Sequence, residues 1–407
     1  MAARTYYYTE DLTRATTITT DFSVFKASFS FTPNGSKNHL VLWRCLLDVA
    51  AGGGAFMAQA RLRNTTDSVT YGTSKIALAQ GASTAQSAGG MAIYTSTASP
   101  GSKTFRVEYA VSNASTTAGI KEVSILVLEL GTNDKFFEST GASSTSSASY
   151  VNKTSLSFTP PSSGDYLLMA HAVKTQSDGG TDCRVRFSNG TTDYVIPSLF
   201  YTVTGDCIPY VQMVFATALS AAQSWTIDHF RLDGVGTTTL QEARIVALRL
   251  ADFEHAYCAE DRTPHTTILA TFANSASVAA TALAVDHAVL ACGIVDMSST
   301  GQVTYASNKV NAGSGGGSDV GSAFSAVNGS VGFNKVWWEF RKRTETAVST
   351  TWRTQYNRVS GTETPTHDEN VIAVLQLGGT STMTVAATGF APLSSTGVIP
   401  IISPSGM

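Results

Sequence analysis

Short apolar stretches rich in β-branched residues recur along the chain, and segments rich in Gly, Asn, Ser and Thr separate them. In one stretch, EARIVALRL at residues 242–250, Val246, Leu248 and Leu250 fall on one side of an extended strand, and the other side is also largely apolar. A strand that is apolar on both sides is typical of the buried middle of a sheet. No stretch of about 12 residues or more combines helix caps with an apolar stripe at helical spacing. The pattern therefore predicts an all-β protein.

The same order of strands occurs three times, and this repeat sets the domain organisation. Each copy contains an apolar strand (38–43, 164–172, 285–293), an Arg-x-Arg strand (61–67, 184–193 and a weaker match at 301–308), an aromatic strand (103–111, 224–232, 336–343) and a closing strand that ends at Leu130, Leu250 or Leu377. The closing strands end 120 and 127 residues apart, which is the size of one β-sandwich domain and much longer than a solenoid repeat. We predict three tandem antiparallel β-sandwich domains.

Changes in composition between the repeats predict the domain boundaries. We place the sandwiches at 21–138, 151–252 and 266–378, with an N-terminal arm at 1–20, a flexible Ser-rich linker at 139–150, an ordered joint at 253–265 and an extended C-terminal tail at 379–407. The tail is uncharged, apolar and interrupted by prolines, whereas a solvated tail usually carries charge. We therefore expect the arm and the tail to lie against neighbouring subunits.

The composition narrows the class of partner. Charged residues make up 14% of the chain, compared with about 25% in an average globular protein, so the surface favours contact with other proteins. The net charge of -3 provides no overall field that would attract a polyanion. We therefore expect neither nucleic acid nor an anionic membrane as the main partner.

The N-terminal sequence and the cysteines bear on the compartment. The first residues, MAARTYYYTEDLT, have no apolar core behind a basic start, which a secretory signal requires, so we expect the chain to begin in a cytoplasm. The five cysteines are scattered and include no CxxC pair, which argues against a disulfide framework or a zinc site. We expect buried thiols, and a bridge between Cys183 and Cys207 stays open.

Motifs for catalysis and for cofactor binding are missing from the sequence. It contains no GxxxxGK[ST] loop, no GxSxG elbow, and no HxH or HExxH pair. Asp67 and Asp193 each follow a Thr-Thr pair, and we interpret them as residues that close a turn in preference to calcium ligands. We predict that the protein is not an enzyme and has no catalytic residues, no cofactor and no metal site.

One region, residues 336–358, departs from this background. It is rich in Trp and Arg, the residue types most frequent at the energetic centres of protein interfaces, and aromatic rings also stack on sugars. Because neighbouring strand residues point to opposite sides, we expect one of Trp337 and Trp338 in the core and the other available for contact. The candidate interaction residues are Trp337, Trp338, Arg341, Arg343, Trp352 and Arg353. An ordinary sandwich strand with solvated basic side chains is the alternative interpretation, and binding of a saccharide or of nucleic acid by this face also stays open.

The repeat also resembles a known class of proteins. Segments 28–42 and 155–169 share a Ser-Phe/Leu-Ser-Phe-Thr-Pro sequence, a polar turn and a strand rich in leucine. Together with the Arg-x-Arg and closing strands, these segments resemble the tandem jelly-roll virion proteins of tailed bacteriophages. The third copy departs from the pattern, with ATFANSAS at 270–277 in place of the Phe-Thr-Pro turn.

This resemblance implies a fold and a function. The sandwiches would be jelly rolls, and the chain would be a virion component, often a homotrimer, that is assembled in the host cytoplasm and contacts the major capsid protein or other virion proteins. We expect a capsid decoration (cement) protein that binds the outer surface of the head and stabilises it. A tail, fibre or receptor-binding protein that contacts a host-surface glycan or protein is the alternative, and a cryptic enzyme is a third hypothesis. The sequence does not distinguish a rod of three sandwiches from a pseudo-threefold cluster.

Overall fold

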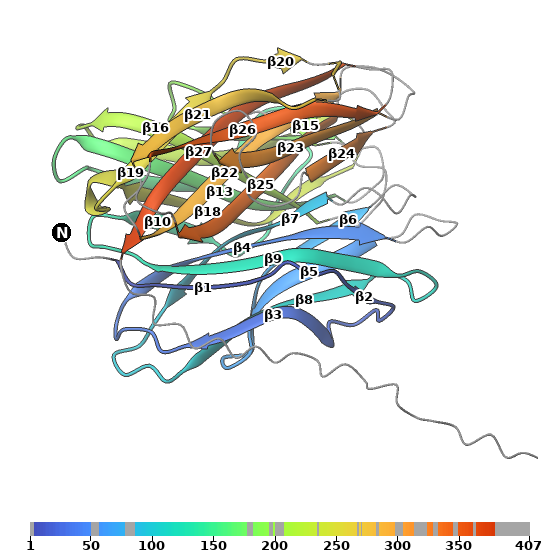
Figure 1. The fold of residues 1–407 in the computed structure, drawn as a ribbon, viewed down its shortest axis with the longest axis horizontal. Coiled ribbons are helices and arrows are strands. Elements are labelled where there is room, and N and C mark those ends of the chain that lie inside the picture. Colours follow the sequence, from blue (N-terminus) through green and yellow to red (C-terminus); the bar gives the residue numbers. More distant parts are fainter. Residues whose placement is uncertain are drawn as a thin grey trace, which may run out of the picture.

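The computed structural model consists almost entirely of β-strands (Figure 1). It describes residues 4–49, 57–77, 86–176, 182–194, 198–199, 207–233, 236–266, 268–269, 271–281, 285–297, 304–312, 324–328, 333–344, 349–360 and 364–378. In these ranges a single turn of 3-10 helix, η1 (Leu250–Asp252), accompanies the strands. No helix in the described part of the chain has the length and apolar character needed to cross a membrane. The predicted all-β fold is confirmed.

Each third of the chain forms a sandwich of an inner and an outer antiparallel sheet. In sandwich 1 the inner sheet has the order β1 (Tyr6–Asp11), β9 (Ala118–Glu129), β4 (Asn38–Val49), β7 (Gln86–Thr95), with β2 (Ala15–Thr17) beside β9. Its outer sheet has the order β3 (Val24–Phe31), β8 (Lys103–Val111), β5 (Met57–Asn64), β6 (Val69–Ala77).

Sandwiches 2 and 3 repeat this arrangement. In sandwich 2 the inner sheet is β10 (Lys135–Ser139), β18 (Thr238–Arg249), β13 (Gly164–Gln176), β16 (Ile208–Leu219), with β11 (Ser143–Thr145) beside β18, and the outer sheet is β12 (Val151–Phe158), β17 (Gln223–Asp233), β14 (Asp182–Ser188), β15 (Ser198–Leu199). In sandwich 3 the inner sheet is β19 (Ala256–Asp261), β27 (Pro365–Gly378), β22 (Asp286–Met297), β25 (Phe333–Thr344), with β20 (His265–Thr266) beside β27, and the outer sheet is β21 (Ala273–Thr281), β26 (Ser349–Ser360), β23 (Thr304–Ala312), β24 (Phe324–Asn328).

The common strand order is that of a jelly roll. In each sandwich the first main strand pairs with the closing strand, the closing strand pairs with the third, and the third pairs with the sixth. The second, seventh, fourth and fifth strands form the outer sheet in that order. Eight strands in two such sheets are the jelly-roll topology, so the prediction of three tandem jelly-roll-like sandwiches is confirmed.

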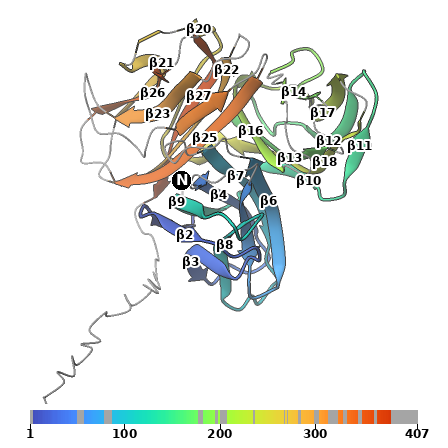
Figure 2. The same ribbon diagram turned by 90° about the vertical axis from the view of Figure 1, so that its right-hand side faces the viewer.

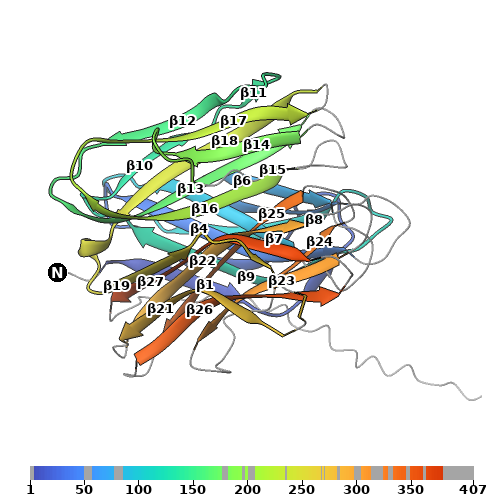
Figure 3. The same cartoon turned by 90° about the horizontal axis from the view of Figure 1, so that it is seen from above.

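The three sandwiches surround a common centre (Figure 2), and seen from above sandwiches 2 and 3 lie side by side with sandwich 1 beyond them (Figure 3). Their inner sheets face one another and share one buried cluster, to which Leu42, Met169 and Leu290 contribute from equivalent third strands. The sixth strands, β7, β16 and β25, pack against one another at the centre. The chain is therefore a pseudo-threefold ring, and a rod is excluded.

The ring explains why the inner strands are apolar on both sides. In β18, Val246 and Leu248 lie in the central cluster, whereas Ile245 and Ala247 lie in the core of sandwich 2. One face of each inner sheet covers its own outer sheet, and the other covers the two neighbouring sandwiches. Since a fully buried Leu, Ile or Val contributes about 1.5–3 kcal/mol, these double-sided sheets hold both the sandwiches and the ring together.

The structure corrects the predicted domain boundaries. The segment predicted as an arm, 1–20, contains β1 and β2, which pair with β9 inside sandwich 1. Sandwich 2 begins with β10 at Lys135, inside the segment predicted as sandwich 1, and the predicted linker at 139–150 contains β11 of sandwich 2. The predicted joint at 253–265 contains β19, the first strand of sandwich 3. These strands are short, and each pairs with a closing strand at the far end of its repeat, which local patterns do not reveal. The predicted tail at 379–407 lies outside the described residues.

Candidate functional sites at the seams between the sandwiches

The tryptophans of the predicted interaction set are buried. Trp337, Trp338 and Trp352 are 1%, 4% and 1% exposed. Trp337 and Trp352 lie in the core of sandwich 3, and Trp338 lies in the central cluster. Trp337 and Trp338 do point to opposite sides, but both sides of this inner sheet are covered. The expectation that one of the two rings is available for a partner is therefore corrected.

The arginines of the set do not share one face. Arg341 and Arg343 lie on β25 of the inner sheet, whereas Arg353 lies on β26 of the outer sheet. Arg343 and Arg353 are half-buried, and Arg341 is fully buried between sandwiches 3 and 1. Arg341 lies at the centre of a cluster of charged side chains.

That cluster joins two sandwiches. We call the boundaries between sandwiches 1 and 2, 2 and 3, and 3 and 1 the first, second and third seams. At the third seam Arg341 Nη2 lies 2.7 Å from Glu122 Oε2, and Nη1 lies 3.3 Å from Glu10 Oε2. In the opposite direction, Arg44 Nη2 of sandwich 1 lies 2.8 Å from Glu339 Oε2 of sandwich 3. Burial raises the pKa of Glu339, against the opposite effect of Arg44, Arg341 and Arg343.

The glutamates that hold Arg341 occupy positions that recur in all three sandwiches. One glutamate lies on the first strand of the inner sheet. The other lies on the closing strand, two residues before the residue that pairs with the first glutamate across the two strands. The first-strand glutamates are Glu10, Glu138 and Glu260, and the closing-strand glutamates are Glu122, Glu242 and Glu369. Each pair binds one arginine: Arg244 at the first seam, Arg262 at the second and Arg341 at the third.

At the first seam the arginine and both glutamates of the cluster belong to sandwich 2. Arg244 Nε lies 3.1 Å from Glu138 Oε2, and Nη1 lies 2.9 Å from Glu242 Oε1. Sandwich 1 approaches His171 of sandwich 2 closely at Gly90, which has no side chain. A Cβ at this position would lie 2.2 Å from Nε2 of His171. Burial, and then Arg244, lower the pKa of His171 well below its usual value, so this ring is neutral. Close packing forms this seam.

At the second seam the cluster belongs to sandwich 3. Arg262 Nη2 lies 3.0 Å from Glu260 Oε2, and its Nη1 pairs with Glu369. From sandwich 2, the Tyr194 ring lies 4.9 Å from the Arg262 guanidinium, and Gln212 Nε2 donates to the backbone carbonyl of Glu369 at 3.5 Å. Burial raises the pKa of Glu369 to about 7, against the lowering effect of Arg262.

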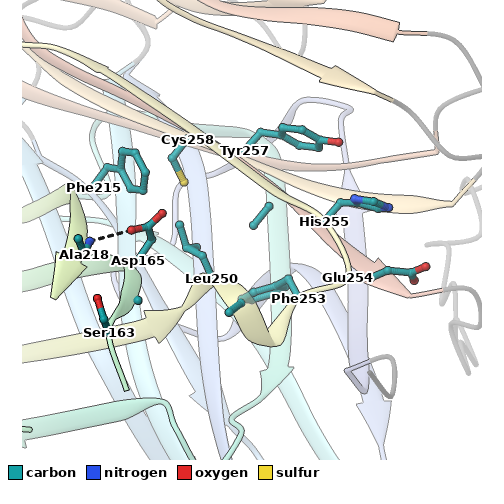
Figure 4. Close-up of a pocket in the computed structure, with 13 residues that line it drawn as sticks. Ser163, Asp165, Phe215, Ala218, Leu250, Phe253, Glu254, His255, Tyr257 and Cys258 are labelled. Atoms are coloured by element: carbon teal, nitrogen blue, oxygen red, sulfur yellow. Dashed lines mark hydrogen bonds between the residues drawn. The ribbon is translucent and has the colours of Figure 1, made fainter. Parts of the chain in front are cut away.

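A cavity of about 600 Å³ lies at the second seam (Figure 4). The start of β13 and the end of β16 form one wall, and the connection from β18 through η1 to β19 forms the other. Its side chains include Asp165, Phe215, Glu254, Tyr257 and Cys258. Burial raises the pKa of the Cys258 thiol to about 12, so the thiol stays protonated and is not a nucleophile.

The other side chains considered for chemistry have structural contacts. Asp67 accepts a hydrogen bond from Asn64 Nδ2 at 2.7 Å within its turn, and Asp193 lies 3.1 Å from Arg186. All five cysteines are present as thiols, so Cys183 and Cys207 form no bridge. Across the described ranges, no group of three or more His, Cys, Asp or Glu side chains is arranged to hold a metal ion.

Comparisons with known proteins give distant structural likenesses. The sequence matches no protein-family model, and a comparison with curated proteins gives no match. The VP2 subviral particle of infectious bursal disease virus is 7% identical and aligns over 92% of this chain and 81% of its own, with a TM-score of 0.23. A structure of Sulfolobus Turreted Icosahedral Virus is 10% identical over 86% and 84%, with a TM-score of 0.21. The CBM22 tandem domain of Paenibacillus barcinonensis Xyn10C is 10% identical over 59% and 93%, with a TM-score of 0.19.

Proposed function

We propose that this protein is a non-enzymatic structural protein of a virion, and that it binds the outer surface of the capsid as a decoration protein. The observation that carries the proposal is the closed ring of three jelly rolls whose inner sheets share one core. Jelly rolls recur in viral capsid and lectin domains, although a fold alone does not define a function. The ring adds a rigid block with three similar outer faces, which suits a position of threefold symmetry on a particle.

The proposed action is stabilisation by contact. A protein that binds only the assembled head shifts the equilibrium toward that head by mass action, and a stable interface buries about 1,200–2,000 Å² in total. The partners would be the major capsid protein or other virion proteins. The homotrimer implied by the sequence resemblance stays a prediction. A single chain already supplies three jelly rolls around one axis, so a trimer of chains is not needed to produce a threefold arrangement.

A tail, fibre or receptor-binding protein is the second candidate. The cavity at the second seam favours it, because a decoration protein that acts by contact area needs no cavity of this size. In this case the protein would contact a host-surface glycan or protein, and the ring would serve as the rigid support of a binding site.

Copy number and solution mass test the proposal. The measurements are sedimentation of the purified chain and its band intensity relative to the major capsid protein in particles that contain it. We expect an abundance close to that of a regular head component, and a mass of either one or three chains. A few copies per particle would contradict decoration and support the tail or fibre role.

A further inference from the structure

We propose that the outer sheet of sandwich 1 binds an acidic segment of a neighbouring protein through an arginine cluster, which consists of Arg61, Arg63 and Arg106 around Glu108. The inference deepens the proposed function and rests on it in one respect, because the acidic segment would belong to another protein of the particle. An excess of cations that the sandwich does not need for its own fold carries the inference.

The arginine cluster lies on the side of sandwich 1 that faces away from the rest of the ring. Arg61 and Arg63 lie on β5, and Arg106 and Glu108 lie on β8. Leu62, between the two arginines of β5, lies in the core of sandwich 1, so Arg61 and Arg63 point outward from the sheet. In Figure 1 this outer sheet forms the lower side of the molecule, away from sandwiches 2 and 3. The side chains of the three arginines are 21%, 32% and 29% exposed, so a partner can reach them.

Two of the three arginines already satisfy the single carboxylate of the cluster. Nε and Nη2 of Arg61 both lie 2.6 Å from Oε2 of Glu108. Nε and Nη2 of Arg106 lie 2.7 Å and 2.5 Å from Oε1 of Glu108. The Glu108 side chain is 0% exposed, so a partner on this face would meet the arginines and not the carboxylate. The cluster as a whole keeps an excess of positive charge.

Arg63 is the arginine of the cluster that lacks a strong partner in the protein. Its Nη1 lies 4.0 Å from Oε2 of Glu108, which is beyond hydrogen-bond distance. Its Nε is buried and has no hydrogen-bond partner among the described residues, and a buried donor without an acceptor destabilises a protein. A carboxylate from outside would supply the missing acceptor in the planar geometry that suits a guanidinium group.

The position of Arg63 is also unfavourable for the sheet itself. Arg63 lies directly opposite Arg106 across β5 and β8, and like charges in directly opposite positions destabilise a sheet. The equivalent pairs in the other sandwiches are Ser188 with Thr226 and Asn311 with Arg353. Neither of these pairs places two cations opposite each other. Sandwich 1 thus keeps a pair that its fold does not require, and such local conflicts are typical of functional sites.

Sandwich 2 contains a balanced form of the same site. Arg186, which lies opposite Asp228 as Arg61 lies opposite Glu108, is 2.8 Å from Asp228 and 3.1 Å from Asp193. Two carboxylates therefore face one arginine, whereas in sandwich 1 three arginines face one carboxylate. Residues 1–130 contain 11 of the 27 Lys and Arg residues but only eight of the 30 Asp and Glu residues. This difference in charge directs an acidic partner to sandwich 1.

Aromatic rings beside the arginines favour a protein as the partner. The guanidinium carbon of Arg61 lies 4.3 Å from the centre of the Phe22 ring, and that of Arg106 lies 5.2 Å from the centre of the Phe25 ring. Arginine together with aromatic residues is typical of the energetic centres of protein interfaces. Nucleic acid would require a longer basic surface, but acidic residues outnumber basic ones in the chain beyond sandwich 1.

The experiment measures binding of a labelled peptide of alternating Glu and Gly to the full chain by fluorescence polarisation. A peptide of alternating Gln and Gly is the neutral control. We expect the Glu peptide to bind at low salt and the Gln peptide not to bind. Binding of the Glu peptide should weaken as salt screens the arginines.

Arg63→Gln separates a binding role from a structural one. It should weaken binding of the Glu peptide about tenfold, because a charge-assisted hydrogen bond is lost. It should also keep or raise the midpoint of thermal unfolding, because the like-charge pair with Arg106 is removed. Arg353→Gln makes the same charge change in sandwich 3, at the position equivalent to Arg106, and is the matched control that should bind like the wild type.

Several results would overturn the proposal. They are no binding of the Glu peptide, equal binding of the Gln peptide, or an Arg63→Gln variant that binds like the wild type or unfolds at a lower temperature. Tighter binding of poly-U RNA than of the Glu peptide would assign the face to nucleic acid. Salt-sensitive self-association that Arg63→Gln abolishes would assign it to a second copy of this chain. Copy number in the particle is measured separately, so this proposal and the proposed function can fail independently.

Discussion

The third seam joins two neighbouring sandwiches by a different kind of contact from the first and second seams. At the third seam, Arg341 and Arg44 pair with glutamates of the opposite sandwich, so ion pairs run between strands of two sandwiches. At the first and second seams, Arg244 and Arg262 pair with glutamates of their own sandwich, and the neighbouring sandwich contributes close packing or polar contacts. The glutamates occupy equivalent positions at all three seams, but the sandwich that supplies the arginine differs.

Chain connectivity explains this difference. Sandwiches 1 and 2, and sandwiches 2 and 3, are joined by connections of a few residues, which hold their surfaces at high effective concentration. Sandwiches 3 and 1 have no such connection, so the contact between them must itself fix how the two sandwiches are positioned. Buried ion pairs contribute more to specificity than to net stability in several systems, because desolvation offsets much of their attraction. We infer that the crossing ion pairs select the correct ring closure.

The largest effect is expected from breaking the crossing cluster. Arg341→Met keeps an apolar stem of similar length but leaves the buried Glu122, together with the more exposed Glu10, without this arginine. Removing one partner of a buried ion pair costs about 3–5 kcal/mol. Guanidinium denaturation should therefore show a marked loss of stability, with unfolding of the ring before unfolding of the separate sandwiches.

The matched control is the equivalent change at the second seam, Arg262→Met. The side chain of Arg262 is 26% exposed, whereas that of Arg341 is 0% exposed, and partly exposed ion pairs contribute about 0–1 kcal/mol. If the two substitutions cost the same, the distinction drawn between the seams is wrong.

An intermediate effect is expected from Gly90→Ala at the first seam. The added Cβ would lie 2.2 Å from Nε2 of His171, so sandwich 1 or the His171 ring has to move, and overpacking of this kind costs about 1–3 kcal/mol. Gly101→Ala is the control, because nothing lies within 4 Å of its added Cβ. A thermal unfolding midpoint for Gly90→Ala equal to that of Gly101→Ala would show that packing at the first seam is loose.

The fold was largely predictable from the sequence, and the reasons are local. The spacing of the closing strands gives three sandwiches, and the two apolar faces of residues 242–250 indicate a buried central strand, as found in β18. The strands that begin each inner sheet were missed. Tyr6–Asp11 was assigned to an arm, because its partner Val123 to Leu128 lies at the other end of the repeat.

The site was much less predictable, because its residues come together only in the ring. Trp337 and Trp338 were expected to divide between core and surface, but a second covering layer on the inner sheet is a property of the assembled sandwiches. The recurring glutamates carry no local motif, and Arg244, Arg262 and Arg341 lie on different elements. Only a register comparison between the repeats, for example Glu10 with Glu138, would have revealed the pattern.

The smallest effect is a pH dependence at the second seam. Burial raises the pKa of Glu369 from an ordinary value of 4.5 to about 7, although Arg262 opposes the shift, and Asp368 and Glu260 also face this carboxyl. Between these two values the folded protein holds a proton that the unfolded chain has released. The stabilising contribution of Glu369 is therefore fully present below about pH 4.5 and is lost as the pH rises through about 7.

Glu369→Gln isolates this contribution, because the amide stays neutral at every pH. Between about pH 5 and pH 8 the wild type should lose about 1 kcal/mol more than the variant in denaturant titrations, a value below the full shift because Arg262 stabilises the charged form. A wild type that instead gains stability relative to the variant over this range would mean that the Arg262 ion pair dominates and the carboxylate is charged throughout. The second seam would then resemble the third more closely than its exposure suggests.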